Sequence, residues 1–341
     1  MELIKILILI IISTSSFSIN KSLCEQVSFN NIKKHTRERN QRNIGYCWAF
    51  AGTALLEEFL CEKDQSKCGV ELSVLDFSRC QFNLGNPQGQ TGGSSFIGLF
   101  CPNNSRGICE EMNAPYSVAT GEVCEGHSIV NGELKKIKVR DCGPASLKMM
   151  YPDIMKRVEY ICKNEEGLPK EEKLLELDAL MIMIYYDALP FIKKDFITRS
   201  DLKIAALNSK SSQEFIKKLY IPSQCEENRI TIPKYEHDEG KLPKEKSATE
   251  KIKLLHNKLT RKQSFSLNIC ANKLTSSFFN TFFGGNNDEC GSHELVVNAI
   301  EYRDGKCQAN LKNSWGRDSE LSGWIDLEDL LEQSNSYTYI K

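Results

Sequence analysis

The sequence predicts an α+β protein whose first part is helical and whose last part is built from β-strands. Residues 47–62 predict a helix, because apolar side chains recur there at helical spacing. A further helix is predicted over 248–262, and strand-like segments follow it. These segments are SFSLNIC (264–270), HELVVNAIEY (293–302), CQANLKNSW (307–315) and GWIDL (323–327).

The intervening regions differ in character. Residues 80–145 are rich in Gly, Asn, Ser and Cys and predict loops held by disulfides. Residues 146–220 predict buried helices, and 222–250, which is charged and contains three prolines, predicts a loop or linker.

Length and composition set the class of protein. A chain of 341 residues predicts about two domains. With 40% apolar and 26% charged residues, it has the make-up of a soluble protein with a substantial core. The net charge of −1, from 44 basic and 45 acidic residues, gives nucleic-acid binding little electrostatic support.

The N-terminus, MELIKILILIIISTSSFSIN, has the pattern of a secretory signal peptide. Its apolar run from Ile6 to Ile12 is short for a membrane span, and Ser18 closes a plausible cleavage site. We therefore expect a secreted or otherwise extracytoplasmic protein that keeps no stable membrane association. The alternatives are a retained anchor, or a lipid anchor at Cys24, which the bulky Leu23 disfavours.

Fourteen cysteines fit such an exported protein, in which most would be paired. No C-x-x-C pair occurs, which argues against a zinc ribbon or a thioredoxin-type site, and we expect no metal and no cofactor. One working thiol would leave thirteen cysteines, so at least one more would be free or intermolecular. The connectivity stays open.

Three residues suggest nucleophilic catalysis. Cys47 stands at the start of a predicted helix, where the positive end of the helix dipole lowers the pKa of a thiol. His293, at the start of a predicted strand, is a candidate to take the thiol proton. Asn313, in the turn after the next strand, could hold the imidazole in one tautomer. Taken singly, such a cysteine or histidine is more often structural.

The residues that flank Cys47, His293 and Asn313 indicate that the three belong to one site. The segment NQRNIGYCWAF carries a Gln-x5-Cys-Trp-Ala-Phe pattern, and GSHELVVNAIEY and LKNSWG contain the histidine and asparagine. LSVLDFSRC (72–80) and a Gly-Gly pair at 92–93 lie between them. In kind and order these motifs resemble the papain-like cysteine proteases, over about residues 40–100 and 250–328.

The resemblance implies a two-lobed fold and a role for each residue. The helical left lobe would carry the nucleophile Cys47, and a β-barrel-like right lobe would carry His293 and Asn313. Gln41 would supply the oxyanion hole together with the Cys47 backbone N–H. Gly92 and Gly93 would let an extended peptide approach the backbone.

The chain departs from this family in three ways. A cysteine pair that the family often has would fall at Ile44 and Gln90, so that disulfide is absent. His293 follows Cys47 by 246 residues rather than about 130–150, which predicts a mainly helical insertion of about 100 residues. Only about 22 residues separate Ser18 from Gln41, too few for a typical propeptide.

The resulting prediction is an exported, monomeric cysteine peptidase that acts on peptide or protein substrates through a thioester. Its predicted parts are a signal peptide (1–18), the left lobe (19–130), an insertion and linker (131–245) and the right lobe (246–341). Two alternatives stay open. One is amide transfer or deamidation by the same residues, and the other is a non-catalytic binding protein on the same scaffold.

Overall fold

The computed structural model describes a part of the chain that includes most of both predicted lobes. The described residues are 19–41, 45–83, 93–104, 107–114, 116, 125–130, 133–138, 156, 201, 204–205, 208–210, 214, 217–218, 221, 223–259, 262–271, 274, 292–316 and 319–341. The predicted signal peptide and most of the predicted helices of 146–220 lie outside this part. Within it, no helix has the length and apolar character that crossing a membrane requires.

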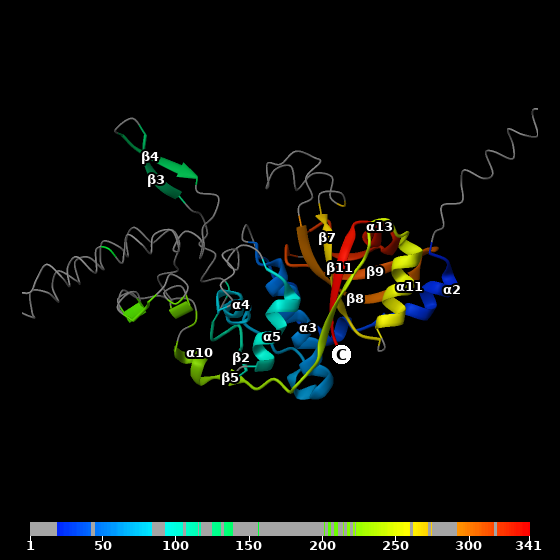
Figure 1. The fold of residues 1–341 in the computed structure, drawn as a ribbon, viewed down its shortest axis with the longest axis horizontal. Helices are drawn as coiled ribbons and strands as arrows, with labels where there is room; N and C mark the ends of the chain where they lie inside the picture. The colour runs from blue at the N-terminus through cyan, green and yellow to red at the C-terminus, as the bar shows by residue number, and fades with distance from the viewer. Residues whose placement is uncertain are drawn as a thin grey trace, which may run out of the picture.

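A seven-stranded sheet forms the body of the C-terminal half (Figure 1). Its order is β10-β9-β8-β7-β11-β6, with β1 paired to β8, and all its pairs are antiparallel. Its strands are β1 (Phe29–Asn30), β6 (His237–Lys241), β7 (Phe265–Cys270), β8 (Ser292–Arg303), β9 (Lys306–Lys312), β10 (Gly323–Asp326) and β11 (Ser334–Ile340). The four predicted strand-like segments correspond to β7, β8, β9 and β10, which confirms the predicted α+β class.

The central strand β8 is buried on both faces from His293 to Ile300. Helices cover the two faces, with α3, α4 and α5 on one side and α2, α11 and α13 on the other (Figure 1). Such double cover explains why β8 reads as a nearly continuous apolar run rather than as an alternation.

Helix α3 (Cys47–Lys63) occupies the centre of the first group, with α4 (Val74–Asn83) and α5 (Ser95–Asn104) packed beside it. Every residue of α3 from Trp48 to Cys61 is buried, as expected for a helix enclosed on all sides. A Cβ at Gly52 would overlap the ring of Phe77, so the close packing of α3 on α4 requires glycine there. The helix predicted over 47–62 is confirmed.

The second group consists of α2 (Lys21–Val27), α11 (Ala248–Lys258) and α13 (Leu327–Glu332). A disulfide between Cys24 and Cys307 ties α2 to β9. Helix α11 begins with a capping box of Ser247 and Glu250. Its buried Lys251 donates hydrogen bonds to the carbonyl oxygens of Leu331 (2.8 Å) and Ser334 (3.1 Å), which fixes α11 on the C-terminal end of α13.

The structure differs from the predicted domain boundaries at both ends of the sheet. Residues 19–30, assigned to the left lobe, lie on the sheet, because the apolar Leu23 and Phe29 are buried in its core. The predicted linker contains β6, which pairs with β11, so this lobe begins before residue 246. Pro233 and Pro243 lie outside the strand and border it without interrupting its ladder.

The described parts of the predicted loop region 80–145 also contain regular structure. They include α5 and a hairpin of β3 (Glu125–Val130) and β4 (Glu133–Lys138). Alternation and helical spacing are weak over such short segments, which is why the composition alone predicted loops.

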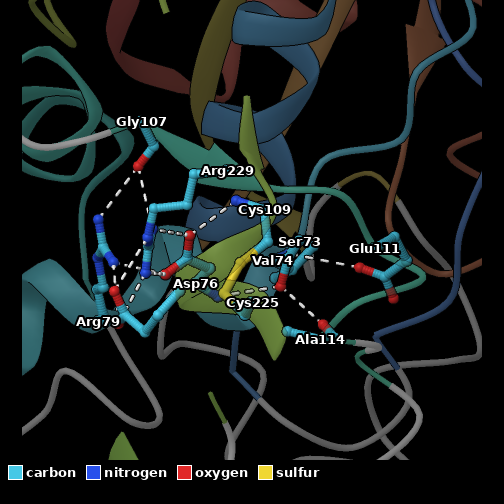
Figure 2. The surroundings of a disulfide bond; sticks show 11 residues. Ser73, Val74, Asp76, Arg79, Gly107, Cys109, Glu111, Ala114, Cys225 and Arg229 are labelled. Carbon is cyan, nitrogen blue, oxygen red and sulfur yellow. Dashed lines mark hydrogen bonds and ion pairs between the residues drawn. A yellow bond between two sulfur atoms is a disulfide. The ribbon is translucent and has the colours of Figure 1, made fainter. Parts of the chain in front are cut away.

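A buried anchor joins the end of the predicted insertion to the left lobe (Figure 2). The short strands β2 (Ile108–Cys109) and β5 (Arg229–Ile230) pair, and a disulfide joins Cys109 to Cys225 of α10 (Ser223–Glu227). Asp76 of α4 is 1% exposed and binds the guanidinium of Arg229 (2.6 Å) and the backbone N–H of Cys109 (2.9 Å). Residues 223–230 therefore belong structurally to the left lobe.

Candidate active site

Cys47 is the first residue of α3, and its side chain is partly exposed. The backbone N–H groups of Trp48, at the helix start, and of Glu294, on β8, lie near the sulfur and act to lower the pKa of the thiol. The sulfur therefore lies beside the residue that follows His293. Among the cysteines whose side chains the structure describes, Cys47 is the free thiol.

His293 is 2% exposed. One neighbour binds its Nε2, and another packs on a face of its ring. Its Nε2 lies 2.8 Å from Oδ1 of Asn313. Since an amide oxygen only accepts, Nε2 carries the proton and Nδ1 is the basic nitrogen. The indole of Trp315 stacks on the imidazole, with ring centroids 3.8 Å apart, and shields this hydrogen bond from water.

Asn313 follows β9, and further hydrogen bonds fix the orientation of its amide. Its Oδ1 also accepts from the backbone N–H of Ser314 (2.7 Å), and its Nδ2 donates to Oγ of Ser319 (3.1 Å). With both ends of the amide bound, the oxygen stays directed at His293.

Gln41 is held beside Asn313 by its contacts with Ser314, the next residue in the turn after β9. Its backbone N–H donates to the carbonyl of Ser314 (2.6 Å), and its own carbonyl accepts from the Tyr116 hydroxyl (2.9 Å). The Ser314 hydroxyl donates to the side-chain oxygen Oε1 of Gln41. The amide nitrogen of Gln41 therefore points away from Ser314.

Gly93 packs directly against the residue that follows the nucleophile. A Cβ at Gly93 would lie 2.6 Å from Cε2 of Trp48, so only glycine fits. Gly93 is also exposed, which leaves its backbone accessible to a peptide. Gly92, together with Ile44 and Gln90 of the missing disulfide, lies outside the described residues.

Burial opposes a lone charge on either member of the pair. Burial, and to a smaller extent the negative charge of Glu294, raises the pKa of the Cys47 thiol to about 12. Burial also lowers the pKa of His293 to about 4, although the hydrogen bond that its Nε2 donates to Asn313 acts to raise it. Desolvation therefore outweighs the effect of the helix start, which was expected to lower the pKa of this thiol, and a proton acceptor is needed.

A thiolate can form here when its proton moves to His293, because the two new charges then stabilise each other in a medium of low dielectric constant. We therefore expect the thiol and the imidazole to ionise as one unit.

Buried charges join the two lobes behind this site. Lys312, which precedes Asn313, donates to Oε2 of Glu57 on α3 (3.3 Å), and Arg39 binds Oε1 of the same carboxylate (2.9 Å). Burial acts to raise the pKa of Glu57, but the positive charges of Arg39 and Lys312 lower it overall. The ion pair between Lys312 and Glu57 therefore holds the turn that contains Asn313 against α3.

Three residues near the site were not predicted from the sequence. Glu294, Ser95 and Ser266 lie at the junction of the lobes and are bound to one another. The available signal was a charged residue inside the apolar run of β8, which by itself does not reveal its partners.

Among the described residues, the potential ligand atoms of Asp76, Cys109 and Cys225 lie close enough together to hold a metal ion. The two cysteines form a disulfide, so neither offers a thiolate to a metal.

One comparison with known proteins agrees with the motif around Cys47. Residues 24–164 match the family model described as "Papain family cysteine protease". The matched segment contains Gln41 and Cys47, whereas His293 and Asn313 lie beyond it. A search of curated proteins found no match.

Two solved structures similar to this chain are of bromelain. The bromelain protease from Ananas comosus in complex with the E64 inhibitor is 13% identical, with a TM-score of 0.45, and the match covers 92% of this chain and 98% of that one. The recombinant stem bromelain precursor is 14% identical, with a TM-score of 0.45 and coverages of 95% and 74%.

Proposed function

We propose that this chain is a cysteine peptidase of the papain-like type that hydrolyses peptide bonds through a thioester at Cys47. One observation supports the proposal above all. The sulfur at the start of α3 lies beside the N–H of the residue after His293, and Nε2 of His293 donates to Oδ1 of Asn313.

The chemistry follows from these positions. Nδ1 of His293 takes the thiol proton while the sulfur attacks the peptide carbonyl carbon, and negative charge moves to the carbonyl oxygen. The Cys47 backbone N–H and the Gln41 amide would stabilise that oxyanion. His293 then protonates the leaving nitrogen, the C–N bond breaks, and a thioester remains.

Water completes the cycle. The imidazole removes a proton from the water that attacks the thioester, the carboxylic acid leaves, and the sulfur regains its proton. Gly93 would contact the backbone of the extended substrate through its exposed main chain.

The disulfides of the described residues support a further part of the proposal, namely that the protein works in an oxidising compartment outside the cytoplasm. We propose a monomer that acts there on peptide or protein substrates. Removal of residues 1–18 during export would be seen by N-terminal sequencing of the secreted protein.

Cys47→Ala tests the catalytic proposal. The variant should lose peptide hydrolysis, and mass spectrometry of the wild type should detect a covalent acyl adduct on Cys47. Lys63→Ala, at the far end of the same helix, is the control and should keep full activity. A product heavier by about one mass unit without chain cleavage would show deamidation instead. Hydrolysis that persists in Cys47→Ala would overturn the assignment.

A further inference from the structure

Glu294 is a carboxylate buried at the junction of the two lobes. It directly follows His293 on β8 and is 6% exposed. Buried carboxylates in proteins are normally paired with a basic side chain. Within the described part of the chain no basic side chain pairs with Glu294, so another role must explain why it is there.

The Glu294 side chain connects three elements. Its Oε2 accepts from the backbone N–H of Ser95, the first residue of α5, at 3.3 Å. Its Oε1 accepts from the hydroxyl of Ser95 and from that of Ser266 on β7, the latter at 2.7 Å. The carboxylate therefore holds the start of α5, in the left lobe, against the sheet of the right lobe.

The backbone of Glu294 makes a second connection, because its N–H lies near the sulfur of Cys47 and acts to lower the pKa of the thiol. Two residues before Ser95, Gly93 lies against Trp48, next to the nucleophile. A single residue thus holds both the nucleophile and the segment on which the substrate backbone would lie.

The charges that face this carboxylate are few. The charge of Glu294 acts on the thiol of Cys47 on α3. Burial, and to a smaller extent the negative charge of Glu239 on β6, raises the pKa of Glu294. Ser95 of α5 and Ser266 of β7 offer only hydroxyl and N–H donors. An ionised Glu294 therefore acts on the nucleophile chiefly by opposing a negative charge on its sulfur.

We propose that Glu294 is a positioning residue for the peptidase reaction, which sets the distance between the Gly93 segment and the Cys47–His293 pair. The inference rests on the proposed function. Glu294 touches no reacting atom with its side chain and acts through Ser95 and Cys47.

Glu294→Gln tests the proposal with a side chain of the same size. The amide keeps one acceptor oxygen and loses the other, so the Gly93 segment should be less firmly held. We expect KM for peptide substrates to rise about tenfold while kcat changes little. Because the negative charge is also lost, iodoacetamide should alkylate Cys47 from a pH about one unit lower.

Two further variants separate position from charge. Ser95→Ala removes a hydroxyl donor and keeps the carboxylate, so KM should rise without any fall in the pH at which Cys47 is alkylated. Glu301→Gln lies on the same strand, where its carboxylate binds Asn30 (2.7 Å), and should change neither quantity. Ser95→Ala also decides the question if Glu294→Gln does not fold.

The outcomes distinguish this inference from the proposed function. If the wild type cleaves peptides and both Glu294→Gln and Ser95→Ala keep the wild-type KM, the positioning role is wrong and the peptidase assignment stands. If the wild type cleaves no peptide, the proposed function fails and this inference fails with it.

Discussion

One hydrogen bond decides which nitrogen of the His293 ring carries the proton. Because Asn313 accepts from Nε2, the basic nitrogen Nδ1 is the one available to the thiol. Trp315 covers the ring, and burial keeps a lone imidazolium unfavourable. At the scale of single residues, the proposed catalysis would thus depend on a neutral imidazole that is held in one tautomer.

Asn313→Ala tests that restraint. The variant loses the acceptor for Nε2, so the wrong tautomer becomes accessible, and kcat/KM should fall roughly 10- to 100-fold. Ser319→Ala removes the partner of Nδ2 and an acceptor for the backbone N–H of Leu321 (3.2 Å), but it keeps the acceptor for Nε2 and should cost about twofold. Steady-state kinetics with one peptide substrate compares the two variants, and equal losses would contradict the tautomer argument.

At the scale of elements, local pattern and long-range contact differ in how far sequence predicts them. The helix that begins at Cys47 and the strand that begins near His293 were predictable, because long apolar runs with regular spacing leave few alternatives. The pairing of β6 with β11 was not, because the polar segment HDEGK at the sheet edge has no apolar face to reveal it.

The candidate site follows the same division. Cys47, His293, Asn313 and Gln41 were predicted from motifs, and the structure brings them together at the junction of α3 and the sheet. Sequence did not predict the effect of burial on the thiol, since desolvation arises from neighbours distant in the chain. For the same reason the carboxylate of Glu294 had no predicted partner.

At the scale of elements, the ion pair between Asp76 of α4 and Arg229 of β5 should stabilise the attachment of residues 223–230 to the left lobe. Asp76→Asn leaves the buried guanidinium of Arg229 without its full countercharge, and should lower the free energy of unfolding by about 3 kcal/mol. Asp326→Asn is the control, because Asp326 pairs with the exposed Lys306 and asparagine keeps the cap of α13. Urea unfolding measures both, and equal small losses would contradict the anchoring role.

At the scale of the whole molecule, the two lobes meet through buried charge, because Lys312 at the end of β9 binds Glu57 of α3. Within the left lobe, Arg39 binds the same Glu57, and its guanidinium also lies 3.5 Å from Oε2 of Glu111. Burial raises the pKa of Glu111 to about 7, although the charge of Arg39 opposes this. Glu111 therefore contributes a pH dependence to the stability of the protein.

The sign of that dependence can be worked out. The pKa of Glu111 is raised from about 4.3 in the unfolded chain, so its contribution to stability is complete below about pH 4.3 and is lost as pH rises to about 7. Glu111→Gln removes this loss. Relative to the wild type, the variant should gain roughly 2–3 kcal/mol between pH 5 and pH 8. Urea unfolding at both pH values measures the change, and an unchanged difference would contradict the assignment.

The central claim is that Cys47 and His293 ionise as one unit, and the rate of Cys47 alkylation by iodoacetamide between pH 4 and pH 10 tests it most directly. In the wild type we expect a rate that is already high and nearly level at neutral pH, because the proton passes to His293. In His293→Asn, reaction should require strongly alkaline pH, because burial raises the pKa of the isolated thiol to about 12. Identical pH profiles for the two proteins would contradict the claim.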